Sequence, residues 1–153
     1  MSNTPTLQDM VTKALSTTRG RLTPQAPLGA RTWFRVGGAA EWLYQPADTE
    51  DLATALQNLS PELPVTVLGA CSNVIIRDGG LEGLVIRLAR GFSGISAEAD
   101  GLVAGGACLD STVAEQAAEA GLAGRDFLAG LPRTICGPVW MHARAFGSEF
   151  VPV

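Results

Sequence analysis

Hydrophobic residues alternate with short polar turns along the whole chain, and their spacing predicts a series of short helices and strands. Apolar side chains recur at helical spacing between Leu7 and Leu15, ahead of Gly20, which predicts an amphipathic helix or an arm docked on the body. The next two segments, 32–38 and 39–46, are rich in aromatic and β-branched residues. They are predicted to be two strands hinged at a Gly-Gly pair.

A second helix is predicted over residues 49–59, with Asp48 as its N-cap. Four apolar residues of this segment line one helical face: Leu52, Ala55, Leu56 and Leu59. Pro64 then precedes an apolar strand at 65–68. The resulting β-β-α-β order across 31–68 predicts a small α/β lobe.

The stretch 65–80 interrupts two apolar runs with a small polar turn. The run 65–68 stops at Gly69-Ala70-Cys71-Ser72-Asn73 and restarts at 74–76, so both flanks have the composition of buried strands. Such a turn lets several backbone N–H groups converge into a nest that binds an anion such as phosphate. The alternative is a tight turn in which Ser and Asn side chains only mimic backbone hydrogen bonds.

The second half of the chain has the pattern of antiparallel hairpins. Residues 83–89, 94–99 and 102–107 are predicted strands, the last two joined by a turn at Asp100-Gly101. Asp110 is predicted to cap a helix that runs through Ala120 and ends at Gly121. We therefore expect an N-terminal helix or arm over 1–20, a first lobe over 21–85 and a second lobe over 86–153.

Composition and charge narrow the class of protein. The 153 residues are 46% hydrophobic, which is enough for a buried core, and the net charge of -4 with a pI near 4.9 includes no basic run. Nucleic acid and anionic membranes are therefore excluded as main partners, and without a signal peptide or spanning run the chain is expected in the cytoplasm. Its cysteines, Cys71, Cys108 and Cys136, and its one histidine, His142, have no zinc-site spacing. Buried or idle thiols are expected, and no metal.

A second glycine-bearing segment lies at 130–147. It reads GLPRTICGPVWMHARAFG and follows an apolar segment, so its backbone is a second candidate for contact with a phosphate. Two phosphate loops on two lobes would fit a dinucleotide held in the cleft between them. We accordingly expect 69–73 and 130–137 to face one cleft.

These segments together resemble a known enzyme family. The stretches 32–52, 65–88 and 121–150 are similar in register to the N-terminal part of the UDP-N-acetylenolpyruvoylglucosamine reductases, also called UDP-N-acetylmuramate dehydrogenases. The resemblance implies an α+β fold of the vanillyl-alcohol-oxidase (PCMH) type, in which two lobes hold FAD and a C-terminal domain helps bind a UDP-sugar. It also implies that NADPH supplies the hydride for reduction of the enolpyruvyl ether, a step in peptidoglycan synthesis.

The resemblance assigns cofactor-binding positions to both loops. The turn 69–73 corresponds to the family's G-x-G-S-N loop on the FAD pyrophosphate, and 130–147 corresponds to its second flavin loop. The positions implied to contact FAD are Gly69, Ala70, Cys71, Ser72, Asn73, Pro132, Arg133, Thr134, Ile135, Gly137, His142, Ala143 and Gly147. No residue of this sequence matches the family's serine proton donor or its neighbouring arginine and glutamate, so no catalytic residue is assigned.

Six loop positions depart from the family pattern. Cys71, Arg133 and Cys136 replace glycine, as does Arg144, while Pro138 replaces alanine and His142 replaces asparagine. A Cβ where the family has glycine is expected to strain the backbone or push the ligand outward. Arg133 could instead pair with a phosphate, or it could be a solvated side chain beside a damaged loop.

Three functions fit these observations. The chain is the FAD-binding part of such a reductase, inactive alone because a UDP-sugar would need the absent domain. Alternatively, it is a non-catalytic flavin or nucleotide module, or a degraded fragment without function. The oligomeric state is left open by the sequence. The aromatic residues Trp33, Phe34 and Trp42 are expected to pack in the core or between lobes, and His142 is expected to have a hydrogen-bonding or steric role.

Overall fold

The computed structural model describes residues 5–150, which form two compact units. Unit 1 comprises the chain up to Leu68 together with Asn73–Gly91, and unit 2 comprises Gly69–Ser72 together with the chain from Phe92 onward. The division expected at 85/86 therefore falls inside a strand, β4 (Leu81–Arg87). The first four residues of the expected N-terminal arm, and the last three of the second lobe, lie outside the described residues.

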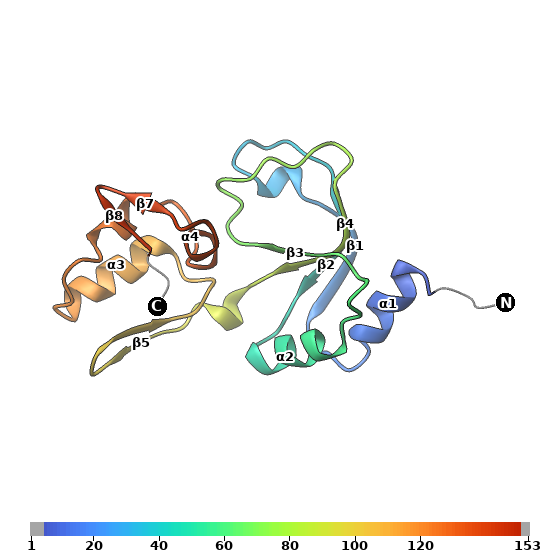
Figure 1. The fold of residues 1–153 in the computed structure, drawn as a ribbon, viewed down its shortest axis with the longest axis horizontal. Coiled ribbons are helices and arrows are strands. Elements are labelled where there is room, and N and C mark those ends of the chain that lie inside the picture. The colour runs from blue at the N-terminus through green and yellow to red at the C-terminus, as the bar shows by residue number, and fades with distance from the viewer. Residues whose placement is uncertain (1–4, 151–153) are drawn as a thin grey trace. The chain divides into compact units, whose positions relative to one another are not determined.

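Unit 1 is a four-stranded sheet with two helices packed on it (Figure 1). The strands are β1 (Arg21–Pro27), β2 (Ala39–Gln45), β3 (Val65–Leu68) and β4, in the order β1-β2-β4-β3. β1 is antiparallel to β2, whereas β2, β4 and β3 are parallel. The expected α/β character of this region is thus confirmed.

The helices α1 (Leu7–Ala14) and α2 (Thr49–Asn58) bury their apolar sides against β2 and β4. The buried cluster comprises Val11, Ala14, Leu15, Tyr44, Ala55, Leu63, Leu84 and Ile86. Both helices were expected within a residue or two of these bounds. Leu56 is an exception, since it is 49% exposed rather than turned to the core.

The strand expected at 32–38 is wrong, and the strand at β1 was missed. Residues 32–38 form an irregular loop after a 3₁₀ turn at Gly29–Arg31, closed by the Thr32 hydroxyl, which donates to the carbonyls of Gly29 and Val36. Trp33 and Phe34 are consequently 65% and 57% exposed and not core residues. β1 contains two prolines, and its position at the edge of the sheet explains why they are tolerated.

The second apolar run, 74–76, is a loop and not the expected buried strand. Arg77 accepts backbone hydrogen bonds at its carbonyl from Gly38 (3.0 Å) and Gly80 (2.9 Å), so this loop pairs with the one at 37–38. A Cβ on Gly38 would collide with the carbonyl of Asp78. Ile76 is buried by this contact while Ile75 is 71% exposed.

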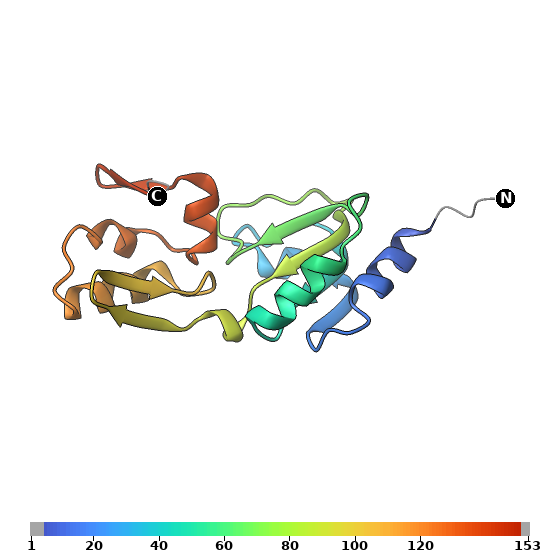
Figure 2. The ribbon, with the colours of Figure 1, turned by 60° about the horizontal axis from the view of Figure 1, so that its bottom comes forward.

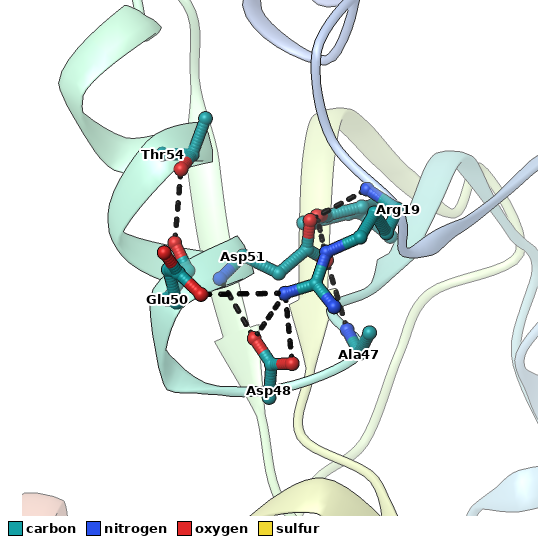
Figure 3. Close-up of polar contacts among 7 residues, drawn as sticks. Arg19, Ala47, Asp48, Glu50, Asp51 and Thr54 are labelled. Atoms are coloured by element: carbon teal, nitrogen blue, oxygen red, sulfur yellow. Dashed lines mark hydrogen bonds and ion pairs between the residues drawn. The ribbon is translucent and has the colours of Figure 1, made fainter.

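A buried carboxylate fixes the start of α2. Asp51 is 3% exposed and accepts hydrogen bonds from Arg19 N (2.6 Å), Tyr44 Oη (2.7 Å) and Ala47 N (2.9 Å) (Figure 3). Burial opposes its ionisation, but the N–H groups of Ala47 and Arg19 outweigh this effect and hold the pKa of Asp51 below its usual value. The same apolar surroundings raise the pKa of Tyr44 to about 12.

Asp48 is the N-cap of α2, as expected from the sequence. One of its oxygens accepts from Asp51 N at 2.9 Å, and both lie within 2.9 Å of the Arg19 guanidinium. This hydrogen bond from the helix, together with the Arg19 contact, lowers the pKa of Asp48. The segment that follows α1 is thereby tied to the first turn of α2.

Unit 2 has smaller sheets (Figure 2). β5 (Ile95–Glu98) and β6 (Gly101–Ala104) form an antiparallel hairpin whose turn is Ala99-Asp100, one residue earlier than expected. α3 (Asp110–Glu119), a 3₁₀ segment (Asp126–Gly130), α4 (Cys136–Met141) and the hairpin β7 (Arg144–Ala145) and β8 (Ser148–Glu149) follow. The hydrophobic cluster of this unit comprises Cys108, Val113, Phe127, Leu128, Leu131 and Ala143.

The predicted end of α3 is confirmed, but the predicted capping residue at its start is not. Gly121 has φ +72° and ends the helix as expected, with its N–H on Ala118 O and that of Leu122 on Ala117 O. Asp110, however, is the first residue of the helix and makes no side-chain capping hydrogen bond. The expected capping role is therefore wrong.

We expect Asp51→Asn to lower the free energy of unfolding at pH 7 by about 2–3 kcal/mol, because three donors converge on a buried charged acceptor. Since the folded-state pKa of Asp51 is depressed, this stabilisation exists above the unfolded pKa and is lost as the pH falls through the folded one. Urea denaturation between pH 7 and pH 3 is the measurement. The exposed neighbour Glu50→Gln is the control, and an equal loss at both pH values would contradict the assignment.

Candidate functional site

The structure brings together the two segments that the sequence nominated as phosphate loops. Ala70 N donates a hydrogen bond of 3.1 Å to Thr134 Oγ1, joining positions 64 residues apart. A Cβ added to Gly69 would lie 2.8 Å from that oxygen and 2.9 Å from Cys136 Sγ. A Cβ at position 69 would therefore displace the ends of these two side chains, while the nearest backbone atom, Gly137 N, would lie 3.8 Å away. Asn73, the last residue of the first loop, belongs to unit 1.

Cys71 has the backbone conformation that favours glycine. Its φ is +58°, in the left-handed region, and its side chain is 6% exposed with the thiol 3.5 Å from the carbonyl of Gly69. The strain expected from replacing a family glycine is thus present at this position. Arg133, Cys136 and Arg144 do not have positive φ, so the expected backbone strain is absent at those three substitutions.

The second segment is held along residues 106–110. The N–H groups of Ile135 and Cys136 donate to Cys108 O and Gly106 O, each at 3.0 Å, and Asp110 N donates to Arg133 O at 3.1 Å. Gly137 N donates to Thr134 O at 2.9 Å. The backbone N–H groups of residues 135–137 thus all donate to carbonyls within the protein.

Several side chains of the two loops are partly exposed. No heavy atom outside the adjacent residues lies within 4 Å of a Cβ built on Gly137, so its face is open. The Thr134 hydroxyl and the side chains of Ser72 and Arg133 are half-buried, and Pro132 is exposed. The site that these residues form is therefore polar in its side chains rather than in its backbone donors.

The end of the second loop is built around α4. Pro138 is the third residue of this helix, in the first turn, where its missing N–H costs little. His142 ends the helix with φ +49°, a conformation that asparagine adopts more readily, and its side chain is exposed. Ala143 is buried, and Gly147 has φ +80° in the turn of the hairpin that Arg144 and Glu149 close with an ion pair.

A buried carboxylic acid lies beneath this segment, and its burial was not anticipated. Asp110 is fully buried, and among the described residues neither of its oxygens has a hydrogen-bond partner. Burial raises the pKa of Asp110 to about 6, opposed by the positive charge of Arg133. In the sequence, Asp110 lies at the start of a predicted helix and was therefore predicted only to be its N-cap. The bridge between Leu109 and Thr134 is what places it under the loop.

Buried thiols were expected, and the structure confirms them at two of three positions. Cys71 and Cys108 are buried, whereas Cys136 is half-buried with its sulfur 3.6 Å from Thr134 Oγ1. Burial raises the pKa of Cys108. Among residues 5–150 there is no cluster of three potential metal ligands, and no helix is long and apolar enough to cross a membrane.

Comparison with known proteins assigns the class. A family model described as an FAD binding domain matches residues 40–151, and the chain therefore belongs to this family of FAD-binding domains. It corresponds to the N-terminal part of the UDP-N-acetylenolpyruvoylglucosamine reductases. The relative from Gluconobacter oxydans is 63% identical over 86% of this chain and 43% of its own length. The relative from Granulibacter bethesdensis is 56% identical over 88% of this chain and 44% of its own length.

A solved structure agrees with the FAD-binding fold and with the reductase family. The crystal structure of UDP-N-acetylenolpyruvylglucosamine reductase from Thermus caldophilus has a TM-score of 0.66 and 33% identity, covering 86% of this chain and 45% of that one. The α+β FAD-binding fold and the family that the sequence analysis named are confirmed. The chain spans less than half the length of the relatives it matches.

We expect the Cys71→Gly variant to be more stable than Cys71→Ala by about 1 kcal/mol, because alanine retains the left-handed strain and glycine removes it. Both variants lose the same thiol, so the comparison isolates the backbone. The measurement is the urea midpoint of each protein. The control is the pair Ser72→Gly and Ser72→Ala, of which the alanine variant should be at least as stable as the glycine variant. If Cys71→Ala is also at least as stable as Cys71→Gly, Cys71 is not strained.

Proposed function

We propose that this chain is the FAD-binding portion of a UDP-N-acetylenolpyruvoylglucosamine reductase, and that the 69–73 and 132–137 segments hold the cofactor. The observation that carries the proposal is the contact between Ala70 N and Thr134 Oγ1, which joins the two segments that the family resemblance assigns to FAD. The family match over 40–151 supports FAD as the ligand.

The residues present fit such a ligand. Gly137 leaves open space above its backbone, and Cys71 has the left-handed backbone conformation that favours glycine. Ser72, Asn73 and the Thr134 hydroxyl would serve as neutral hydrogen-bonding groups, and Arg133 would add charge for the pyrophosphate. Because Asp110 lies within electrostatic range of Arg133, the guanidinium is partly compensated from below.

Cys136 has a different effect from Cys71. Its sulfur lies against Gly69 at the junction of the two loops, so it occupies volume where a family glycine would leave room. The cost to a ligand there is steric. The exposed His142, in place of the family's asparagine, would lie at the end of the same loop and act by hydrogen bonding or bulk.

Bound FAD would supply a hydride acceptor, with NADPH as donor by family resemblance. The chain's own residues would bind and orient the cofactor and exclude water from it. Reduction of the UDP-sugar would also require the proton donor and charged groups that the resemblance locates outside this sequence. We accordingly propose that a UDP-sugar binds only when the remaining part of a reductase is supplied, and that the protein works in the cytoplasm.

A second candidate, a flavin or nucleotide module without catalysis, is favoured by one observation. The N–H groups of residues 135–137 are engaged within the protein, which leaves fewer donors for a pyrophosphate than a phosphate nest offers. This candidate would be supported if the chain binds FAD weakly and shows no reductase activity even after the remaining part of a reductase is added.

Titration of the apoprotein with FAD, followed by flavin fluorescence, tests the proposal. We expect saturable binding that the double reversion Cys71→Gly/Cys136→Gly tightens at least tenfold, since relief of strain and bulk amounts to about 1–3 kcal/mol for each site. Leu56→Ala, which changes a side chain 49% exposed on α2 of unit 1, is the control. Absence of binding in both proteins, with native circular dichroism, would refute the proposed function.

The chain reconstituted with FAD is expected to show no UDP-N-acetylglucosamine enolpyruvate-dependent oxidation of NADPH. Loss of a positioned acid alone costs about 10²–10⁴-fold in rate, and the stabilising charges are missing with it. NADPH absorbance is followed with and without the substrate. Substrate-dependent turnover at about 1 s⁻¹ or faster, a rate ordinary for enzymes, would place catalytic groups within these 153 residues.

A further inference from the structure

Unit 2 buries a carboxyl group that its own donors do not satisfy. The Asp110 side chain is 0% exposed, and among the described residues neither of its oxygens has a hydrogen-bond partner. A carboxylate is costly to bury without donors, whereas the protonated acid carries no charge. The protonation state of Asp110 therefore depends on the charges that lie around it.

Asp110 is attached through its backbone to the second loop. Its N–H donates to Arg133 O at 3.1 Å, and the preceding Leu109 forms a β-bridge with Thr134. Arg133 and Thr134 belong to the segment proposed to hold the cofactor, and Thr134 also accepts the hydrogen bond from Ala70 N. The buried carboxyl group therefore lies under residues that would contact a pyrophosphate, without reaching solvent itself.

Arg133 is the one ionised group of the described residues whose charge acts on the Asp110 carboxyl. Burial raises the pKa of the neighbouring Cys108 thiol, which stays uncharged. Neither Asp126, on the 3₁₀ segment packed against α3, nor Glu115, on α3 itself, contributes. The guanidinium opposes the effect of burial, but the pKa of Asp110 still rises to about 6. The carboxyl group is thus close to the pH at which its charge changes.

A pyrophosphate bound at Arg133 would compete with ionised Asp110 for the same positive charge. Two anions near one guanidinium repel each other, and the repulsion is strong where water is excluded. Uptake of a proton by the carboxyl relieves it, because the neutral acid neither repels the ligand nor shares the charge of Arg133. Protonation and ligand binding therefore favour each other by the same factor.

We propose that Asp110 is a positioning residue for the pyrophosphate of a dinucleotide: it takes up a proton when the ligand binds, which leaves the whole charge of Arg133 to the pyrophosphate. The inference rests on the proposed function for the location of the ligand. The proton comes from the buffer and stays on the Asp110 carboxyl until the ligand leaves. It follows that Arg133 pairs with the ligand rather than with solvent, and that binding is strongest in mild acid.

Calorimetric titration of the apoprotein with FAD between pH 5 and pH 8 tests the inference. Each titration is made in MES and in Bis-Tris, because buffers with different ionisation enthalpies reveal how many protons are taken up. We expect the dissociation constant to rise about tenfold across this range, with uptake of up to one proton for each FAD bound. ADP-ribose, a pyrophosphate diester without flavin and without a group that titrates near pH 6, should behave in the same way.

Two variants separate the carboxyl from the guanidinium. Asp110→Asn retains the shape of the side chain but cannot titrate, so it should bind FAD without proton uptake and with the same affinity at every pH. Arg133→Gln should weaken binding at least tenfold at pH 5, where Asp110 is already neutral. Glu115→Gln removes an exposed acidic side chain from the same helix and should retain the pH dependence of the original chain. Circular dichroism of each variant verifies its fold.

The ligand-free protein provides a second measurement. Because the folded-state pKa of Asp110 is raised, the original chain should lose stability relative to Asp110→Asn as the pH rises from 4 to 7. The urea midpoints of both proteins across this range are compared. A difference in midpoint that does not change with pH would show that Asp110 does not titrate in the folded protein, which contradicts the inference.

The outcomes distinguish this inference from the proposed function. FAD binding without proton uptake, or with a pH dependence that Asp110→Asn retains, would overturn the inference and leave the proposed function intact. Binding of ADP-ribose with proton uptake, but no binding of FAD, would contradict the proposed function alone. If neither ligand binds, no pyrophosphate occupies the site at Arg133, and both are wrong.

Discussion

The candidate site depends on one hydrogen bond, from Ala70 N to Thr134 Oγ1. It joins a four-residue piece, Gly69–Ser72, to a unit whose other residues begin at Phe92. A Cβ at Gly69 would lie within 3 Å of Thr134 Oγ1 and Cys136 Sγ, which are the ends of two side chains. A side chain at that position would therefore make both of them shift, including the hydroxyl that accepts from Ala70 N. The two loops become one site through this contact rather than through their separate glycine content.

The substitutions at the site act through different physical mechanisms. Cys71 stores backbone strain because its φ is positive, whereas Cys136 is helical and acts through the volume of its sulfur. Pro138 lies in the first turn of α4 and has little cost there. A sequence motif records all three only as departures from the family pattern. Backbone conformation therefore decides which departures are costly, and of these three only Cys71 has a positive φ.

Several helix boundaries could be predicted from the sequence because they are set by residues within one or two turns. Asp48 before an apolar helical face located α2, and Gly121 located the end of α3, because a cap and a left-handed glycine act over a few residues. The loop at 32–38 was misassigned since its aromatic composition is typical of a strand, while the Thr32 hydroxyl bonds that close it are invisible to composition. β1 was missed because its prolines suit only an edge strand. The hydrogen bonds of the second loop were missed for the same reason, since the carbonyls that accept from Ile135 N and Cys136 N belong to Cys108 and Gly106, far earlier in the sequence.

The two units treat a buried carboxyl group differently. In unit 1, the buried Asp51 receives three hydrogen bonds, and its pKa is lowered despite its burial. In unit 2, the buried Asp110 has no such donors among the described residues, and its pKa is raised to about 6. The cost of burying this acid is absent below the pKa of the unfolded chain, grows as the pH rises and is complete above the folded pKa. In unit 1 the carboxylate of Asp51 is satisfied within its own chain, although Trp42 Nε1 is buried there without a partner among the described residues. The two units therefore differ in how they satisfy a buried carboxylate, and the cost of burying a charge falls on unit 2.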